Sequence, residues 1–192
     1  MRHLMLDVEA LGKPATGTLL QVGAVLFDRD APMTQFDAIG PDRRFLATIR
    51  LESVDLAKID PATLRWWLTQ TDQAARESVF TEDGLEDAEL LSQLHTFIIK
   101  SDPSLLITSQ PSYDIGHLYA LYARHDRRVP WDHRIEHGTR EIHQLAEQSG
   151  IPSAEFDNAI QHNAFHDALS QAKDYAATWQ ALQRMRRPPN FE

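Results

Sequence analysis

Two carboxylates stand two positions apart at the end of the first apolar run. Asp7 and Glu9 follow Leu4, Met5 and Leu6, and on a β-strand the side chains at i and i+2 point to the same face. Carboxylates gathered on one face are suited to holding hard divalent cations. An Asp-x-Glu pair is also common where a strand ends in solvent, so the pair alone does not decide the function.

Two further acids and a histidine stand where they could join this pair. Asp114 follows the apolar Leu105–Ile107 segment and opens a helical segment, where an acid also serves as a cap. His162 and Asp167 stand at the start of the last helical segment. A histidine imidazole can be neutral at pH 7 and accept a proton from water. Taken singly, each residue has an ordinary explanation as a capping or solvated side chain.

Together these five residues resemble the DEDDh exonucleases of the RNase T-like group. That group has four acids in this order and a histidine five positions before the last acid, here Asp7, Glu9, Asp114, His162 and Asp167. Similar segments surround them over nearly the whole chain, namely Leu6–Gly12, Leu20–Val25, Thr63–Leu68, Ser112–Ile115 and Pro130–Trp131. The last three are similar to a subgroup of phage DexA-like exonucleases and bacterial 3′ exoribonucleases.

Two segments depart from the pattern of this subgroup. Ser109-Gln110-Pro111 stands where the subgroup usually has Asn-Gly, and His137-Gly138 stands where it commonly has Arg-Asp. The first departure predicts a reshaped substrate groove with Asp114 unchanged. The second leaves its stretch uninformative about the substrate.

The resemblance implies a 3′-to-5′ exonuclease that hydrolyses phosphodiester bonds at the 3′ end of single-stranded RNA or DNA and releases nucleoside 5′-monophosphates. It also implies two divalent cations, Mg²⁺ or Mn²⁺, about 3.5–4 Å apart. Asp7 would bridge both cations, with Glu9 and Asp167 on the side of the attacking water and Asp114 on the other. His162 would be the general base. A homodimer is a further expectation from the resemblance.

Three side chains are candidates for contacting the bases of a strand end. Stacking on an apolar or aromatic side chain contributes about 1–3 kcal/mol per base and tolerates any sequence. Leu11 resembles the position that wedges against the terminal base in related enzymes, and Trp66 and Tyr113 are candidate platforms. For Trp67, on the apolar side of the same helical segment as Trp66, we expect core packing instead.

A second motif indicates another class of enzyme. His133-Arg134-Ile135-Glu136-His137 matches the His-x-x-Glu-His pattern of inverted zinc peptidases. That motif needs a helix to bring both histidines to one metal, and Pro130 and Gly138 leave room for only about two turns. A third alternative is a catalytically inactive nucleic-acid-binding module, which would lack one of the acids or the histidine. All five positions are filled, which favours the active exonuclease.

Alternating strand and helix patterns surround these residues. The strands are predicted at Leu4–Leu6, Leu19–Phe27, Phe45–Leu51 and Ser104–Thr108. The helices are predicted from Pro61, with Asp60 as the start signal, then over Leu85–Ile99, Tyr113–Arg124 and Phe165–Arg187. Val129–Ile142 is interpreted as a loop that leaves room for one short strand.

The composition suits one domain. A chain of 192 residues that is 42% hydrophobic can bury one sizeable core, and the 19 basic and 28 acidic residues give a net charge of −9. That charge disfavours tight binding along a polyanion but is compatible with gripping a strand end. The absence of cysteine excludes disulfides, thiolate metal sites and cysteine nucleophiles and fits a reducing compartment. We expect no signal peptide or membrane span, and a cytoplasmic location.

We therefore predict an α/β fold over residues 1–187, followed by a short tail at 188–192. The resemblance implies an RNase H-like fold, with a central mixed five-stranded sheet, helices on both faces, and the second strand antiparallel to the first. It places the active site where the first strand ends beside the last helix.

Overall fold

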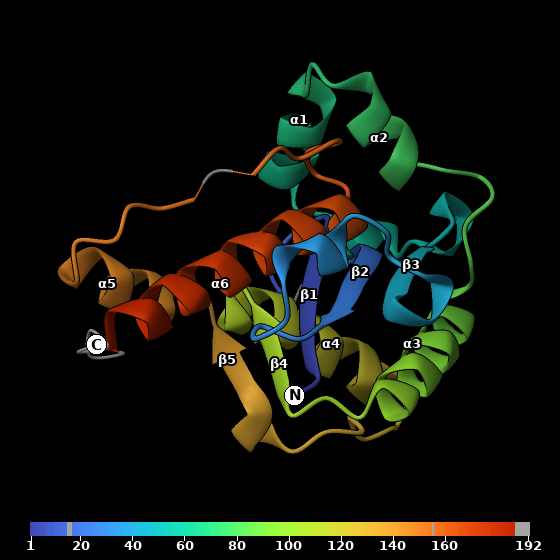
Figure 1. Cartoon of the computed structure of the whole chain (residues 1–192). Coiled ribbons are helices and arrows are strands. Elements are labelled where there is room, and N and C mark those ends of the chain that lie inside the picture. Colours follow the sequence, from blue (N-terminus) through green and yellow to red (C-terminus); the bar gives the residue numbers. More distant parts are fainter. Residues whose placement is uncertain (15–16, 155, 187–192) are drawn as a thin grey trace, which may run out of the picture.

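The chain folds around one five-stranded mixed sheet in a computed structural model that describes residues 1–14, 17–154 and 156–186. The strand order is β3-β2-β1-β4-β5 (Figure 1). The strands are β1 (His3–Ala10), β2 (Leu19–Phe27), β3 (Arg44–Thr48), β4 (Leu105–Thr108) and β5 (Glu136–Gly138). β2 runs antiparallel to β1 and β3, whereas β4 is parallel to β1 and β5. The predicted RNase H-like arrangement is confirmed.

Helices cover both faces of this sheet. They are α1 (Pro61–Thr69), α2 (Gln73–Val79), α3 (Asp87–Ser101), α4 (Pro111–Arg124), α5 (Arg140–Gln148) and α6 (Ala164–Arg186). Figure 1 shows α6 crossing one face, with α3 and α4 on the other and α1 and α2 beyond the end of β1. Within the described residues no helix combines the length and the apolar stretch that a bilayer crossing requires.

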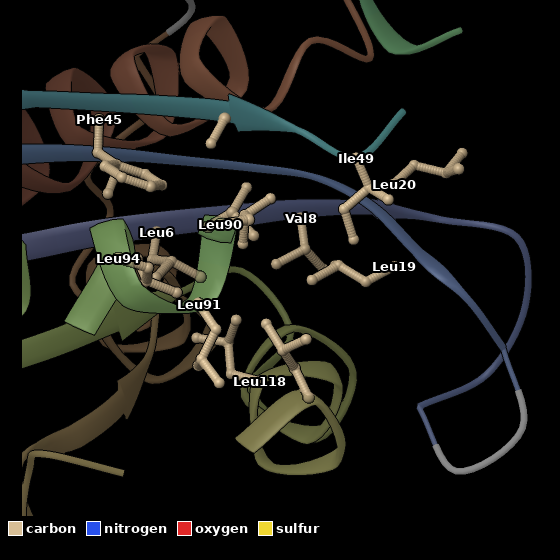
Figure 2. Packing of buried hydrophobic residues seen from close by; sticks show 14 of the residues in the cluster. Leu6, Val8, Leu19, Leu20, Phe45, Ile49, Leu90, Leu91, Leu94 and Leu118 are labelled. Carbon is tan, nitrogen blue, oxygen red and sulfur yellow. The ribbon is translucent and has the colours of Figure 1, made fainter. Parts of the chain in front are cut away.

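The alternation of side chains along β1 decides which face receives its acids. Leu4, Leu6 and Val8 belong to the core beneath α3 and α4, whereas Met5 belongs to the core beneath α6. Figure 2 shows Leu6 and Val8 among the side chains of the first core. Asp7, two residues after Met5, therefore points toward α6, and Glu9 follows it. The apolar stripe of α6 packs on the same face.

Local capping explains where α1 and α6 begin. The Asp60 side chain accepts hydrogen bonds from the N–H groups of Ala62 and Thr63, and Pro61 occupies the first helical position of α1. At α6, Asn163 Oδ1 accepts from the N–H groups of the second and third helical residues, each at 3.2 Å. The last helix is described to Arg186, so the predicted end at Arg187 and the tail at 188–192 lie outside the described residues.

The structure differs from the sequence prediction in several elements. α2 and α5, helices of seven and nine residues, were not predicted. The third strand ends at Thr48, before the predicted Leu51. Val129–Ile142 contains the expected short strand, β5, but also a 3₁₀ turn at His133–Ile135 and the first turn of α5.

Candidate active site

The predicted acids and the histidine come from three elements that meet at the carboxyl end of β1. β1 carries Asp7 and Glu9, the first turn of α4 carries Asp114, and the start of α6 carries Asp167 with His162 just before it. One ligand atom each from Glu9, His162 and Asp167 lies within 4.8 Å of the other two. These three residues therefore share a site large enough for one metal ion.

Asp7 lies at the buried centre of this cluster. Its side chain is 8% exposed, and its Oδ1 accepts a hydrogen bond of 2.9 Å from Gln171 Nε2 on α6. Burial raises the pKa of Asp7 well above its usual value, and the nearby charges of Asp114 and Asp167 raise it further. Asp7 is thus the carboxylate on which the charges of both Asp114 and Asp167 act.

Asp114 lies on the α4 side of Asp7 and outside the group of three ligand atoms. It is 3% exposed, and its Oδ2 accepts a hydrogen bond of 3.0 Å from the backbone N–H of Gln110. Burial raises its pKa to about 6. The Asp114 carboxylate caps the start of its own helix. Asp114 therefore serves as a cap and also lies near Asp7.

Glu9 and Asp167 form the second half of the cluster. Burial is the largest cause that raises the pKa of Glu9, and the charges of Asp7 and Asp167 raise it further. Burial also raises the pKa of Asp167, whereas hydrogen bonds from Asn158 Nδ2 and from the His162 N–H, the latter at 3.0 Å, lower it. Asp167 is therefore held in place by the loop that precedes α6.

His162 has an unusual backbone and an aromatic neighbour. Its φ is 59°, in the left-handed region that few residues other than glycine adopt. Its ring packs edge-to-face on Trp66, with 4.7 Å between the ring centroids and 86° between the planes. The backbone bond to Asp167 and the contact with Trp66 together aim a partly buried imidazole at the acids.

A hollow of about 350 Å³ opens next to Glu9. Its lining consists of Val8, Glu9, Ala10, Ala62, Thr63, Trp66, Trp67 and Tyr113. Trp66 is 40% exposed, whereas Trp67 is 1% exposed and packs in the core as expected. Burial and the nearby Glu9 raise the pKa of Tyr113 to about 12, so its phenol is neutral at pH 7.

Leu11 does not line this hollow. Its side chain is 2% exposed and packs in the core beneath α3 and α4. The structure therefore corrects the expectation that Leu11 contacts a terminal base, because the side chain presents no free surface. The position of Leu11 just after the first motif did not reveal that its side chain is buried.

The predicted zinc-peptidase motif lies away from this cluster and is not helical. His133 belongs to a 3₁₀ turn and His137 to β5, and both side chains are exposed. Glu136 Oε1 accepts hydrogen bonds from Tyr119 and Trp131, at 2.6 and 2.8 Å. No group of three metal ligands that includes either histidine occurs in the described part of the chain. The structure therefore contradicts the zinc-peptidase alternative.

The donor set around Asp7 fits hard divalent cations. It consists of carboxylate oxygens and one imidazole, and Mg²⁺ and Mn²⁺ take mainly oxygen ligands. Among the described residues, Gln171 Oε1 and Asn158 Oδ1 are buried in contact with these acids and have no hydrogen-bond partner. Because burial raises the pKa of all four carboxyl groups, and neighbouring negative charges raise those of Asp7 and Glu9 further, added positive charge would stabilise the ionised cluster.

Two residues of the site were missed from the sequence. Gln171 lies four residues after Asp167, and this helical spacing places both side chains on one face. That spacing was a usable signal. Asn158 stands in the loop before α6, where no pattern indicates that it bonds to Asp167.

A family model described as the Rv2179c-like 3′-5′ exoribonuclease domain matches residues 2–179. No curated protein matches the sequence.

Solved structures share the fold at low sequence identity. The nuclease domain of 3′hExo bound to rAMP, a DEDDh family member, is 10% identical with a TM-score of 0.56, over 94% of this chain and 92% of that chain. The zinc-bound E. coli ExoI–ssDNA complex is 18% identical with a TM-score of 0.62, over 97% of this chain and 41% of that chain. A product-bound exonuclease I is 16% identical with a TM-score of 0.59, over 95% and 43%. This chain therefore spans less than half the length of exonuclease I.

Proposed function

Since this chain belongs to the family of the Rv2179c-like 3′-5′ exoribonuclease domain and is a 3′-to-5′ exonuclease, we propose that it removes nucleotides from single-stranded RNA with two divalent cations. The observation that carries this proposal is that Glu9, His162 and Asp167 come within 4.8 Å of one another beside the hollow lined by Trp66 and Tyr113. Asp7 lies near enough to Asp114 and Asp167 for their charges to raise its pKa. A catalytically inactive binding module would have no need for the histidine in that position.

The acids would hold the cations. Glu9 and Asp167, whose oxygens lie within 4.8 Å of each other, would share one cation, and Asp7 would bridge it to a second cation held with Asp114. When bound, Mg²⁺ or Mn²⁺ supplies the positive charge that activates water and stabilises the transition state of phosphodiester hydrolysis. The same charge would offset the repulsion that raises the pKa of Asp7 and Glu9 and the burial that raises that of Asp167.

His162 would act as the general base. Its ring nitrogen accepts a proton from the attacking water, and because the residue is only partly buried it can release that proton to solvent. Trp66 packs on the ring and limits its rotation. Removal of the ring would therefore reduce the rate of the chemical step more than the binding of metal.

The hollow would receive the terminal nucleoside. Trp66 offers an exposed indole for stacking, and the neutral phenol of Tyr113 lies beside Glu9. Neither contact reads a base edge, so we propose trimming with little base preference. The cytoplasmic location and the homodimer stay predictions.

The test is trimming of 5′-labelled oligonucleotides by the purified protein. RNA and DNA of one sequence, single- and double-stranded, are incubated with Mg²⁺, Mn²⁺, Zn²⁺ or EDTA. We expect single-stranded RNA to shorten stepwise from its 3′ end with Mg²⁺ or Mn²⁺ and to remain intact in EDTA. Faster trimming of DNA would overturn the choice of substrate.

The matched control is Asp7→Asn. It keeps an oxygen that can accept the hydrogen bond from Gln171 but removes the charge. We expect the folded variant to leave the RNA intact. Trimming at the wild-type rate by this variant would reject the assignment of the site.

A further inference from the structure

One fully buried amide ties the start of α6 to the sheet. Gln21 is 0% exposed and stands on β2 directly opposite Glu9 in the strand pairing. Its Oε1 accepts a hydrogen bond of 2.8 Å from the backbone N–H of Ala164, the first residue of α6. This amide therefore joins the strand next to the β1 acids to the helix that carries Asp167.

The hydrogen bonds of the Gln21 NH₂ group determine the orientation of the amide. Gln21 Nε2 donates to Thr48 Oγ1 at 2.8 Å and to the Ser78 carbonyl oxygen at 2.7 Å. Both partners accept, so the NH₂ group must face them and Oε1 must face Ala164. All the hydrogen-bonding groups of the buried side chain are thereby used, and they link β3 and α2 to α6.

A glycine lets the helix approach closely enough for this bond. Gly23 pairs with Asp7 across the strands, and a Cβ atom at Gly23 would lie 2.1 Å from the Ala164 carbonyl carbon. The first turn of α6 therefore rests directly on the β2 backbone. Any larger residue at this position would force the helix start away from Asp7 and Glu9.

The N–H groups of the first turn of a helix lack partners within the helix. Asn163 Oδ1 accepts from two of them, and Gln21 accepts from that of Ala164. Ala164 is two residues from His162 and three from Asp167. A shift of α6 along the sheet would thus move both side chains relative to the β1 acids, and displacements of about 1 Å can reduce catalysis by about 100-fold.

We propose that Gln21 is a positioning residue for the exonuclease reaction, one that sets His162 and Asp167 against Asp7 and Glu9 without touching the substrate. The role rests on the proposed function of those residues. It predicts an effect on the chemical step and on metal binding, with little effect on the hollow lined by Trp66 and Tyr113.

The first variant is Gln21→Met, which keeps the length of the side chain and removes all three hydrogen bonds. We expect kcat for RNA trimming to fall by about 10- to 100-fold and KM to change by less than about threefold. Mn²⁺ affinity, measured without substrate by electron paramagnetic resonance, should fall by about tenfold. Amide hydrogen exchange at Ala164, followed by NMR, should become faster because the N–H loses its acceptor.

Gln35→Met is the matched control. Gln35 is a partly buried glutamine whose amide donates to the Asp28 carbonyl oxygen and accepts from the Asp28 N–H, in the loop after β2. Its substitution removes the same chemical group away from the carboxyl end of β1. We expect wild-type kcat, Mn²⁺ affinity and Ala164 exchange in this variant.

Thr48→Val covers the case in which Gln21→Met does not fold. It removes one hydroxyl acceptor of the Gln21 amide and retains a β-branched side chain on β3. With the amide less firmly oriented, we expect kcat to fall by about two- to fivefold and Ala164 exchange to rise.

The outcomes separate this proposal from the proposed function. If the wild-type protein trims no oligonucleotide, the proposed function fails, and the metal-affinity and exchange measurements still test Gln21. If the wild-type protein is active and folded Gln21→Met, or Thr48→Val in its place, retains wild-type kcat and Ala164 exchange, the positioning role is overturned.

Discussion

At the scale of single residues, the site is a cluster of like charges that the fold holds together against their repulsion. Burial raises the pKa of Asp7, Glu9, Asp114 and Asp167, and the charges of neighbouring acids raise those of Asp7 and Glu9 further. Such an arrangement opposes folding stability when the groups ionise and favours the binding of cations. It is the physical sign of a site that was selected for binding rather than for stability.

Asp7→Asn should therefore stabilise the metal-free protein. The amide keeps an acceptor for Gln171 and removes one charge from the cluster. We expect its free energy of unfolding in urea and EDTA to exceed that of the wild-type protein by about 1 kcal/mol or more at pH 8. The gain should shrink as the pH falls from 8 to 5, because a carboxyl with a raised folded pKa costs less stability as the pH approaches its unfolded pKa. A lower stability than wild type at pH 8 would contradict this account of the cluster.

His162→Ala should separate chemistry from metal binding. Loss of a general base typically slows a reaction by about 10²–10⁴-fold. We expect kcat to fall by that amount, whereas Mn²⁺ affinity should change far less than in Asp7→Asn, because the carboxylates remain. Rapid trimming by His162→Ala would show that the proton has another acceptor.

At the scale of elements, the site depends on helix starts. α4 and α6 each bring an acid to the end of β1 in their first turn, and α1 brings Trp66 to the side of His162. The position of each side chain is thus only as well determined as the cap of its helix. Asp60 is the cap that determines the start of α1.

Asp60→Ala should loosen the Trp66 side of the hollow. It removes the side-chain acceptor of the Ala62 and Thr63 N–H groups. We expect a lower melting temperature and a KM for RNA raised by about two- to fivefold, with kcat nearly unchanged because the acids lie on other elements. Asp60→Asn, which preserves the cap, should behave as the wild type. Equal KM values in both variants and the wild type would show that Trp66 does not contribute to substrate binding.

At the scale of the whole molecule, metal binding and pH should be linked. The folded pKa of Asp114 is about 6, above its usual value of 3.8. A raised carboxyl pKa contributes stability at low pH that is lost as the pH rises from about 4 through about 6. Divalent cations need the ionised carboxylates, so they should restore this stability only on the alkaline side.

Melting temperatures with Mg²⁺ and with EDTA, measured from pH 5 to pH 8, test this linkage. We expect the rise in melting temperature caused by Mg²⁺ to grow with pH and to be small at pH 5. Asp114→Asn should weaken the pH dependence, since its side chain cannot ionise. A rise that is independent of pH would show that Mg²⁺ binds elsewhere.

The sequence by itself determined the features that depend on near neighbours. The period-two alternation of β1 placed Asp7 and Glu9 on one face, the apolar stripe identified α6, and Asp60-Pro61 marked the start of α1. The order and spacing of the acids and His162 indicated the exonuclease family, and the family model bears out that recognition. The first three of these signals lie within one strand or a few helical turns, whereas the acids and His162 were identified through the resemblance to a family whose pattern spans most of the chain.

Only the tertiary structure determined which residues far apart in the sequence contact each other and which side chains are buried. It buried Leu11, left the His-x-x-Glu-His motif outside a helix, and brought Gln171 to Asp7 and Gln21 to Ala164. In each bonded pair more than 140 positions separate the partners. Local propensity carries no information about such contacts, because a side chain's burial and hydrogen-bond partners depend on which elements the folded sheet places against it.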